Sequence, residues 1–261
     1  MSESASYSTT LRRSIIGIAH PQILATTWFT TGHDRLDLEL GGGLARGRLH
    51  EVFTGCPDDM GSASGFAMML TLRARRPGAA ILWLRTDNAE RRSGCFHAPG
   101  FAELGGDPEA VILGLAPDDV SLLRCAADAA RCAGLGVVIA ECWGHPRVLD
   151  LTATRRLTLA AEKSGVTILL LRMDAEPMPS AADTRWQVRA APSQALEANA
   201  PGHAALEIEL LRRRAGPAGM RWRVEWNRDE CIFREPALSG AVVSLPFGRP
   251  AADKRPLRRT A

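Results

Sequence analysis

The residues with the clearest potential for chemistry lie in a Gly-, Pro-, Asp- and Ser-rich segment from Thr54 to Gly65. It joins the apolar run ending in Val52 and Phe53 to a second apolar run beginning at Phe66. Strand, glycine-bearing loop and helix in this order are the layout of a phosphate-binding loop. Such a loop reads GxxxxGK[ST]: backbone amides hold the phosphates, the lysine reaches the terminal phosphates, and the hydroxyl holds magnesium.

The segment lacks the groups that perform this chemistry. Counting from Gly55 puts a methionine at the second glycine, and counting from the next residue reaches Gly61 but loses the first glycine. No lysine follows in either register, and Asp58 and Asp59 place negative charge where a triphosphate would sit. We predict a loop that caps a helix and no longer binds nucleotide. Its vestigial positions are Gly55, Gly61, Ser62 and Ser64.

Two carboxylates follow apolar strands in the way that nucleotide hydrolysis would require. Asp87 comes after the run 80–84, and Glu141 ends the run 136–141, which has the shape of a magnesium-orienting Walker B strand. An acidic residue at a strand end can also simply cap the following turn. Because an acidic base serves no reaction without bound phosphate and metal, we interpret both positions as vestigial.

The elements around these residues alternate strand and helix from Leu49 to Leu171, which predicts a mostly parallel sheet flanked by helices. The continuous apolar runs indicate strands buried on both faces. We expect strands over 49–53, 80–84, 110–115, 136–141 and 166–171, and helices over 65–75, 99–106, 117–133 and 150–163.

From residue 184 the pattern changes to strict alternation, which is typical of half-exposed antiparallel strands. The Gly-Pro turn within 214–220 predicts that the last two of these strands pair as a hairpin. Five arginines are expected on its solvent face: Arg185, Arg189, Arg213, Arg221 and Arg223. That face is either simply solvated or a surface for nucleic acid or an acidic protein.

The segment TTGHDRLDLELGGGLARGRLHEVFTG, residues 30–55, resembles the segment that leads into the nucleotide loop of bacterial RecA. The matching residues are Gly32, Leu36, Leu38, Gly42, Gly43, Leu44, Gly47, Arg48 and Glu51. A RecA-like protein of this length without the loop lysine resembles the ImuA family over nearly the whole chain. Members of that family are encoded with a Y-family polymerase-like protein, ImuB, and an error-prone replicative-type polymerase.

This resemblance implies a non-catalytic, RecA-like adaptor in SOS-induced translesion, mutagenic DNA synthesis. Its implied partners are ImuB and, in addition, RecA and the replicative-type polymerase, with DNA contact indirect or weak. In RecA, single-stranded DNA is bound by two loops after the last strands of the core. Here the second of these, 173–184, carries three acidic residues that disfavour a phosphate backbone.

The chain divides by pattern into an N-terminal segment 1–29, a RecA-like core 30–183, an antiparallel hairpin extension 184–235 and a basic tail 236–261. Pro-containing basic tails often bind a partner, and the C-terminal region is the expected contact in ImuA-like proteins. We therefore expect partner contacts at the tail and at the hairpin arginines: Arg249, Lys254, Arg255, Arg258, Arg259, Arg221 and Arg223.

Composition excludes several other classes of protein. The chain has 261 residues, 46% of them hydrophobic, which is ordinary for a globular protein, and its net charge of +3 is too small to indicate nucleic-acid binding by itself. The six cysteines form no CxxC pair and the six histidines show no metal-ligand spacing, so we expect neither disulfide, metal nor cofactor. Without a signal peptide or a membrane-spanning run, the expected location is the cytoplasm.

Two other functions remain open on the sequence. The first is a RecA-like ATPase with an unorthodox loop, which would bind ATP and magnesium. The second is a RecA-like cell-division inhibitor that binds the tubulin-like division protein through the same degenerate core.

Overall fold

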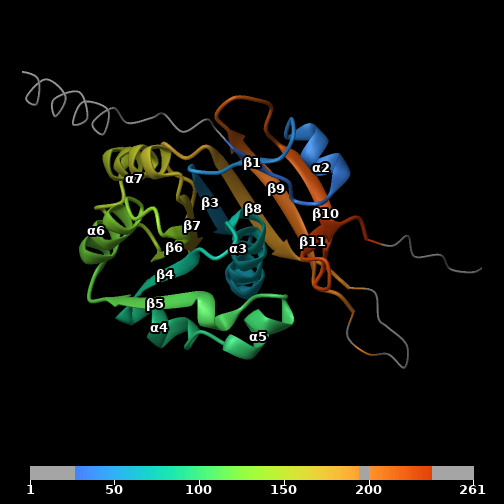
Figure 1. The fold of residues 1–261 in the computed structure, drawn as a ribbon, viewed down its shortest axis with the longest axis horizontal. Coiled ribbons are helices and arrows are strands. Elements are labelled where there is room, and N and C mark those ends of the chain that lie inside the picture. The colour runs from blue at the N-terminus through green and yellow to red at the C-terminus, as the bar shows by residue number, and fades with distance from the viewer. Residues whose placement is uncertain (1–26, 194–199, 201, 237–261) are drawn as a thin grey trace, which may run out of the picture.

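A computed structural model describes residues 27–193, 200 and 202–236. Its centre is a nine-stranded sheet in the order β11-β10-β9-β8-β3-β7-β6-β4-β5 (Figure 1). Six adjacent strands, from β8 to β5, run parallel, and β9, β10 and β11 continue the sheet antiparallel. The bounds are β3 Leu49–Thr54, β4 Ala80–Thr86, β5 Val111–Ala116, β6 Leu135–Trp143, β7 Thr167–Met173, β8 Thr184–Ala190, β9 Ala205–Arg213, β10 Met220–Asn227 and β11 Ile232–Arg234. This is the predicted α/β fold with a C-terminal antiparallel extension, and the prediction is confirmed.

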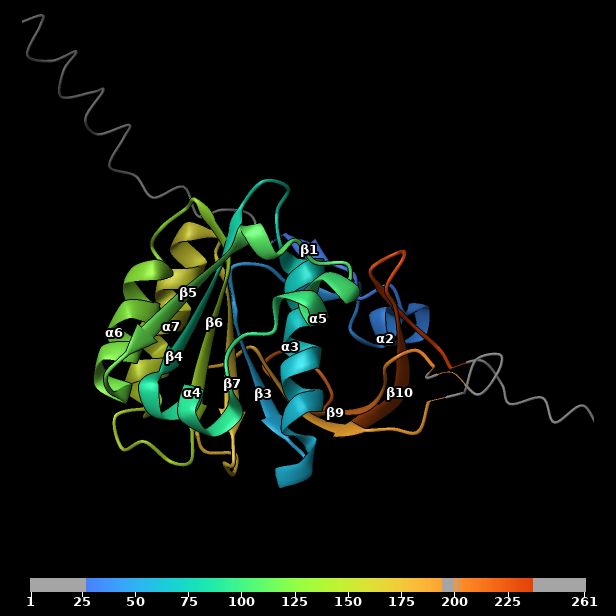
Figure 2. The same ribbon diagram turned by 90° about the horizontal axis from the view of Figure 1, so that it is seen from below.

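Helices cover both faces of the parallel part, as Figure 2 shows. On one face α3 (Met60–Ala74) packs on the sheet. On the other lie α6 (Asp119–Ala129) and α7 (Leu151–Ser164). β3 and β7 are buried along their whole length because they are central and covered on both sides.

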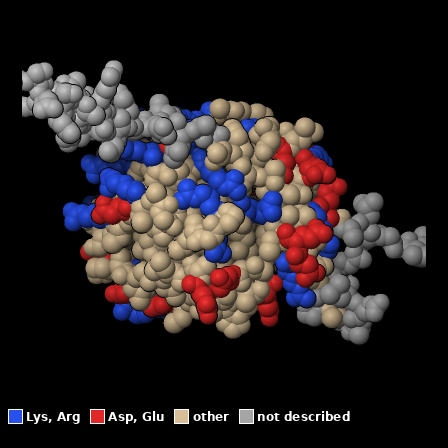
Figure 3. Space-filling view, in the orientation of Figure 1, with Lys and Arg blue, Asp and Glu red and all other residues tan. Residues whose placement is uncertain are grey.

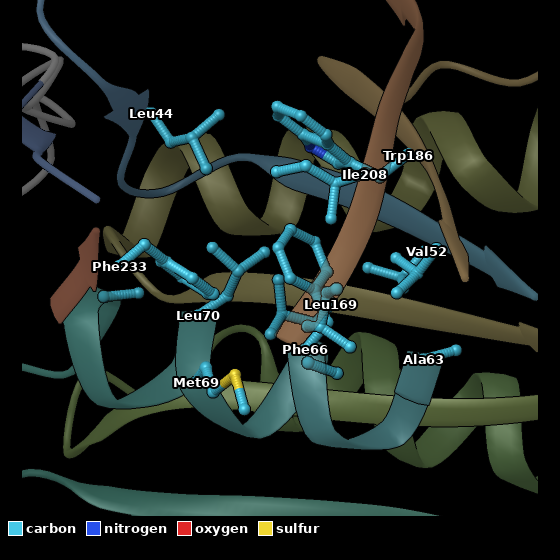
Figure 4. Close-up of a cluster of buried hydrophobic side chains, with 14 of the residues drawn as sticks. Leu44, Val52, Ala63, Phe66, Met69, Leu70, Leu169, Trp186, Ile208 and Phe233 are labelled. Carbon is cyan, nitrogen blue, oxygen red and sulfur yellow. The ribbon is translucent and has the colours of Figure 1, made fainter. Parts of the chain in front are cut away.

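The larger of two apolar cores lies between α3 and the sheet (Figure 4). Phe66 and Leu70 of α3 lie in one cluster with side chains of β3 and β7, and with Trp186 of β8. The Phe66 ring lies 5.9 Å from the Trp186 ring and 5.5 Å from that of Phe233. Because Trp186 and Phe233 belong to the C-terminal strands, the extension shares its core with the parallel sheet.

Helix α7 shows how local sequence sets the element boundaries. The Asp150 side chain caps the helix by accepting a hydrogen bond from Ala153 N at 2.7 Å, and Gly165 ends it in the left-handed conformation at φ +79°. Leu157 and Ala161 lie on its buried side, in the second core with Leu49 and Ile168. The predicted helix 150–163 is confirmed.

Smaller elements complete the fold. The two-stranded pair β1 (Trp28–Phe29) and β2 (Leu44–Ala45) lies at the N-terminal side, with α2 (Asp34–Glu39) between them in the chain. Short helical segments connect the other elements: η1 Pro57–Asp59, α4 Asp87–Ser93, α5 Ala98–Glu103 and η2 Pro108–Ala110. Among the described residues, no helix is long and apolar enough to cross a membrane.

Two strand predictions were wrong. β5 was expected to be buried, but it is the outermost strand of the sheet and exposes Ile112, Leu113 and Leu115. β8 was expected to be purely antiparallel, but it pairs parallel with β3 and antiparallel with β9. The predicted hairpin of β9 and β10 is confirmed, whereas a domain division at residue 183 stays a prediction.

Candidate functional site

The degenerate loop is a tight turn between β3 and α3. Helix α3 begins at Met60, five residues earlier than predicted, so the vestigial positions Gly61, Ser62 and Ser64 lie inside its first turns. This start supports the register counted from Gly55, in which the helix begins at the second glycine of the pattern. Met60 therefore replaces that glycine, and Gly61 stands where the lysine should be.

The loop is tied to β8 by its own groups. The Gly55 amide donates to the Val188 carbonyl at 2.8 Å. The carboxylate of Asp59, only 7% exposed, accepts from the Ala190 amide at 2.8 Å and from the Cys56 thiol at 3.1 Å. The stem of Arg189 packs so closely on Gly55 that a Cβ there would lie 2.2 Å from its Cγ. A buried anion bonded to β8 thus lies in the loop that would bind a phosphate.

The second vestigial position, Glu141, is 2% exposed and surrounded by donors. Its carboxylate forms an ion pair with Arg85 (Nε to Oε2, 3.0 Å). It also accepts hydrogen bonds from the indole N–H groups of Trp143 at 2.8 Å and Trp83 at 3.3 Å, and from the Ser93 hydroxyl at 3.4 Å. The Arg85 guanidinium in turn donates to the Gly94 carbonyl at 2.7 Å. Both oxygens of Glu141 are therefore bonded to the protein, which leaves little capacity for magnesium or its water ligands.

The third position, Asp87, is exposed and is the first residue of α4. The cap of this helix is Thr86, whose hydroxyl accepts from Ala89 N at 3.1 Å. The capping role considered for Asp87 thus belongs to its neighbour. Among the described residues there is also no group of three or more His, Cys, Asp or Glu that could hold a metal ion.

A groove of about 490 Å³ runs beside these residues, between α3 and the α4–α5 region. Glu141 and the vestigial Gly61 and Ser64 lie on its wall, but most of the lining is apolar and aromatic. Its one arginine is Arg85, whose charge is paired with Glu141, so the groove offers no free guanidinium to a triphosphate. The main apolar lining residues are Met60, Met68, Trp83, Phe96, Phe101, Leu104 and Met173.

A second buried charge cluster lies across the neighbouring strands β3, β7 and β8. Glu51, fully buried, pairs with Arg185 at 2.9 Å and faces Arg172 at 3.8 Å. Burial lowers the pKa of Arg172, and the charge of Glu51 partly offsets this effect. Both guanidinium groups also lie over the Phe53 ring, at 5.3 Å and 5.6 Å. The prediction that Arg185 belongs to a solvent face was therefore wrong, because its side chain points from β8 to Glu51.

This cluster contacts the two loops that were predicted to correspond to the DNA-binding loops of RecA. Arg172 donates to the Gly144 carbonyl at 3.3 Å, in the loop after β6. Arg185 and Glu51 both bond the Ser180 hydroxyl, at 3.0 Å and 2.7 Å, in the segment after β7. Arg172 and Arg185 are thus bonded within the protein, whereas Arg147 of the loop after β6 is exposed.

Comparison with known proteins decides the family. No protein-family model matches the chain. It is 33% identical over 201 residues to Protein ImuA of Caulobacter vibrioides, in each of two strains, and the alignment covers 72% of this chain and 72% of the relative. The chain belongs to the ImuA family.

The fold of this ImuA-family protein is also similar to a solved structure, that of the RadB recombinase. The two share 15% sequence identity with a TM-score of 0.53, and the match covers 80% of this chain and 100% of the other. At this identity the likeness shows the RecA-like fold alone.

The hairpin arginines form a charge ladder on the open face of the extension. Arg221 of β10 lies opposite Glu209 of β9, with a 2.9 Å ion pair, and Arg223 lies opposite Glu207. Arg189 of β8 lies on the other side of Glu207. This ladder borders a shallow groove of about 280 Å³. Arg221 and Arg223 are exposed, and their role as partner contacts stays a prediction.

One arginine predicted for the solvent face does not lie on it, and the predicted tail contacts are not described. Arg213 was expected to be exposed, but its half-buried guanidinium donates to the Glu39 and Leu40 carbonyls at the end of α2. The tail residues Arg249, Lys254, Arg255, Arg258 and Arg259 lie outside the described residues.

Several residues that define the site in this ImuA-family protein were not predicted. Trp83, Arg85 and Trp143, which bond Glu141, and Arg172, which faces Glu51, all lie within apolar strands. A usable signal was available, since a charged or indole-bearing side chain inside a run buried on both faces must find a partner there.

Proposed function

We propose that this ImuA-family protein is a non-catalytic adaptor in SOS-induced translesion DNA synthesis. It links the Y-family polymerase-like protein ImuB to RecA, with an error-prone replicative-type polymerase as a further partner. The family membership supports the setting in damage-induced mutagenesis. The single observation that carries the non-catalytic role is the saturated Glu141 carboxylate, bonded to Arg85, Trp83, Trp143 and Ser93.

The degenerate loop and Glu141 do not supply the groups that ATP turnover needs. A phosphoryl-transfer site needs cations at the phosphates, a carboxylate for magnesium and a positioned water. Here the lysine is replaced by Gly61, and the only lysines of the sequence, Lys163 and Lys254, lie far along the chain. The loop instead contains the buried Asp59, and Glu141 is bonded within the protein. The fold would then serve to present a rigid surface to partner proteins.

A nucleotide titration tests the non-catalytic part. We expect the full chain to show no submillimolar binding of a fluorescent ATP analogue in the presence of magnesium, and no phosphate release. A RecA protein serves as the positive control. Submillimolar binding that is abolished by substituting Gly61 and Asp87 would contradict the proposal and support the ATPase alternative.

A co-purification experiment tests the adaptor part. Tagged full-length protein from DNA-damaged cells of its host is expected to recover the polymerase-like protein and RecA. We expect the double variant Arg221→Glu, Arg223→Glu to recover less of at least one partner. The matched control is Arg155→Glu, Arg156→Glu, which reverses two exposed charges on α7 instead. Recovery of the tubulin-like division protein in place of these partners would favour the division-inhibitor alternative.

A further inference from the structure

The sheet has two edges, and only one is protected within the described residues. At one end β11 is three residues long and contains Arg234, and its Phe233 amide donates to the Thr31 carbonyl at 3.0 Å. At the other end the six-residue strand β5 pairs only with β4. Its outer row of backbone amides and carbonyls has no partner strand among the described residues. Short length, charge and coverage are the usual protections of an edge, and within the described part of the chain β5 has none of them.

The side chains of β5 are those of a covered strand. Its sequence, Val-Ile-Leu-Gly-Leu-Ala, contains no charge and no proline, yet Ile112, Leu113 and Leu115 are 52%, 49% and 54% exposed. Leu113 and Leu115 lie beside Trp83 and Arg85 of β4, on the face that carries the apolar groove. Exposed apolar edges of this kind are sites of strand addition or aggregation. We therefore expect this edge to be covered when the protein works.

The charges at the two ends of β5 indicate what covers it. Asp107 and Glu109 precede the strand, and Asp118 and Asp119 follow it. The Ser121 amide donates to the Asp118 carboxylate at 2.7 Å, which lowers the pKa of Asp118, whereas burial and the charge of Asp118 raise the pKa of Asp119. In Figure 3, the lower part of the molecule, where Figure 1 places β5, is mostly uncharged, with acidic side chains on either side and basic ones beside the acidic group at the lower left.

These acidic ends argue against pairing of β5 with a second copy of itself. An antiparallel pair would place Glu109 of one copy near Asp118 and Asp119 of the other, and like charges facing across strands are destabilising. A strand with basic residues at both ends instead meets opposite charge in either direction. Charge complementarity therefore favours a different segment over a second copy.

We propose that β5 binds an extended apolar segment of a partner protein, flanked on both sides by lysine or arginine, which adds to the sheet as a further strand. The backbone of β5 supplies the hydrogen bonds, and the carboxylates at its ends select the basic flanks. Apolar side chains of the segment cover Leu113 and Leu115 on one face and Ile112 on the other. This inference rests on the adaptor proposal and assigns it a protein-binding edge.

Two synthetic peptides test the inference on the full chain. Both contain the same apolar segment of alternating valine and leucine, one flanked by lysines and the other by glutamates. We expect the lysine-flanked peptide to bind in a fluorescence anisotropy titration and to slow amide hydrogen exchange of residues 111–116. We expect at least a tenfold weaker response to the glutamate-flanked peptide.

Surface variants locate the binding edge. Leu113→Lys and Leu115→Lys are expected to abolish binding and the slowed exchange, and these residues are exposed enough for the fold to persist, which circular dichroism checks. Leu159→Lys is the matched control, because Leu159 is 65% exposed but lies on α7. Glu109→Lys should weaken binding of the lysine-flanked peptide and strengthen that of the glutamate-flanked one.

Three outcomes would overturn the inference. They are equal binding of both peptides, no slowed exchange in β5 with either peptide, and a dimer of the free protein that dissociates in Leu113→Lys, as measured by sedimentation. None of these depends on recovery of the polymerase-like protein. If that protein is recovered equally by wild type and Leu113→Lys and the peptides do not bind, the strand-addition inference fails while the adaptor proposal stands.

Discussion

At the scale of single residues, the site is defined by which buried charges have partners. Glu141 and Arg85 are 2% and 7% exposed in their side chains and lie 3.0 Å apart. Breaking a buried ion pair by removing one member leaves an uncompensated charge, which is far more costly than losing an exposed pair. Removing either member alone should therefore be costly, because the remaining charge stays buried without its partner.

We predict that Arg85→Ala lowers the free energy of unfolding by about 3–5 kcal/mol. The matched control is Arg221→Ala, which removes one member of an ion pair with a 73% exposed guanidinium and should cost less than about 1 kcal/mol. Urea denaturation of the three proteins measures both values. Equal losses in the two variants would contradict the assignment of Arg85 as the buried partner of Glu141.

The sequence predicted the place of Glu141 but not its partners. A carboxylate after an apolar run can be recognised from local pattern alone. Its donors come from β4, α4 and β6, and depend on which strands are neighbours in the sheet. Arg185 was misplaced for the same reason, because alternation alone does not tell which face of a strand meets the buried Glu51.

At the scale of elements, the ends of helix α7 were the most predictable feature. Caps and glycines marked the ends of α7 correctly, because these signals act within a few residues. β5 was misjudged because an apolar run indicates cover on both faces, while strand order decides which strand lies at the edge. The start of α3 was also missed, although Asp59 is of a type favoured at an N-cap; its carboxylate bonds the Ala190 amide of β8 and makes no cap hydrogen bond to the helix.

One glycine contact allows a prediction at this scale. Gly47 precedes β3 at φ +66°, and a Cβ there would lie 3.1 Å from Gly165 Cα and 3.2 Å from the Ala161 carbonyl oxygen at the end of α7. Gly78 has a similar φ of +73° but faces open space. We expect Gly78→Ala to cost about 1 kcal/mol of unfolding free energy, from backbone conformation alone.

Gly47→Ala should cost more than Gly78→Ala, because α7 must also move away from β3. Thermal and urea unfolding of the two variants measure the difference. A Gly47→Ala protein as stable as Gly78→Ala would show that the contact between this turn and α7 yields without cost.

At the scale of the whole molecule, one buried histidine couples stability to pH. His50 is fully buried in β3; its Nε2 lies 2.9 Å from the Ala45 carbonyl and its Nδ1 lies 2.8 Å from the Thr184 hydroxyl. A carbonyl can only accept, so Nε2 carries the proton and Nδ1 accepts from the hydroxyl. Burial lowers the pKa of His50, and the Ala45 hydrogen bond only partly opposes this effect.

The free energy of unfolding should therefore decrease at low pH. The unfolded chain takes up a proton at about pH 6.5, whereas the folded protein resists it, so stability is full above that value and falls as the pH drops. We predict a loss of up to about 1.4 kcal/mol per pH unit from this residue in urea unfolding between about pH 7 and about pH 5. The slope should decrease in His50→Gln and persist in the control His203→Gln. Identical slopes in all three proteins would contradict a neutral, buried His50.

The continuous sheet sets the distance between the two proposed partner-binding surfaces. Seven strand-to-strand steps of about 4.8 Å separate β5 from β10, which places the acid-flanked edge and the arginine ladder roughly 30 Å apart along the sheet. Because hydrogen-bonded strands join the two surfaces without a hinge, the distance between them is fixed by the fold. The protein is then a rigid spacer: two partners bound at these surfaces would be held at a set separation and would not compete for the same place.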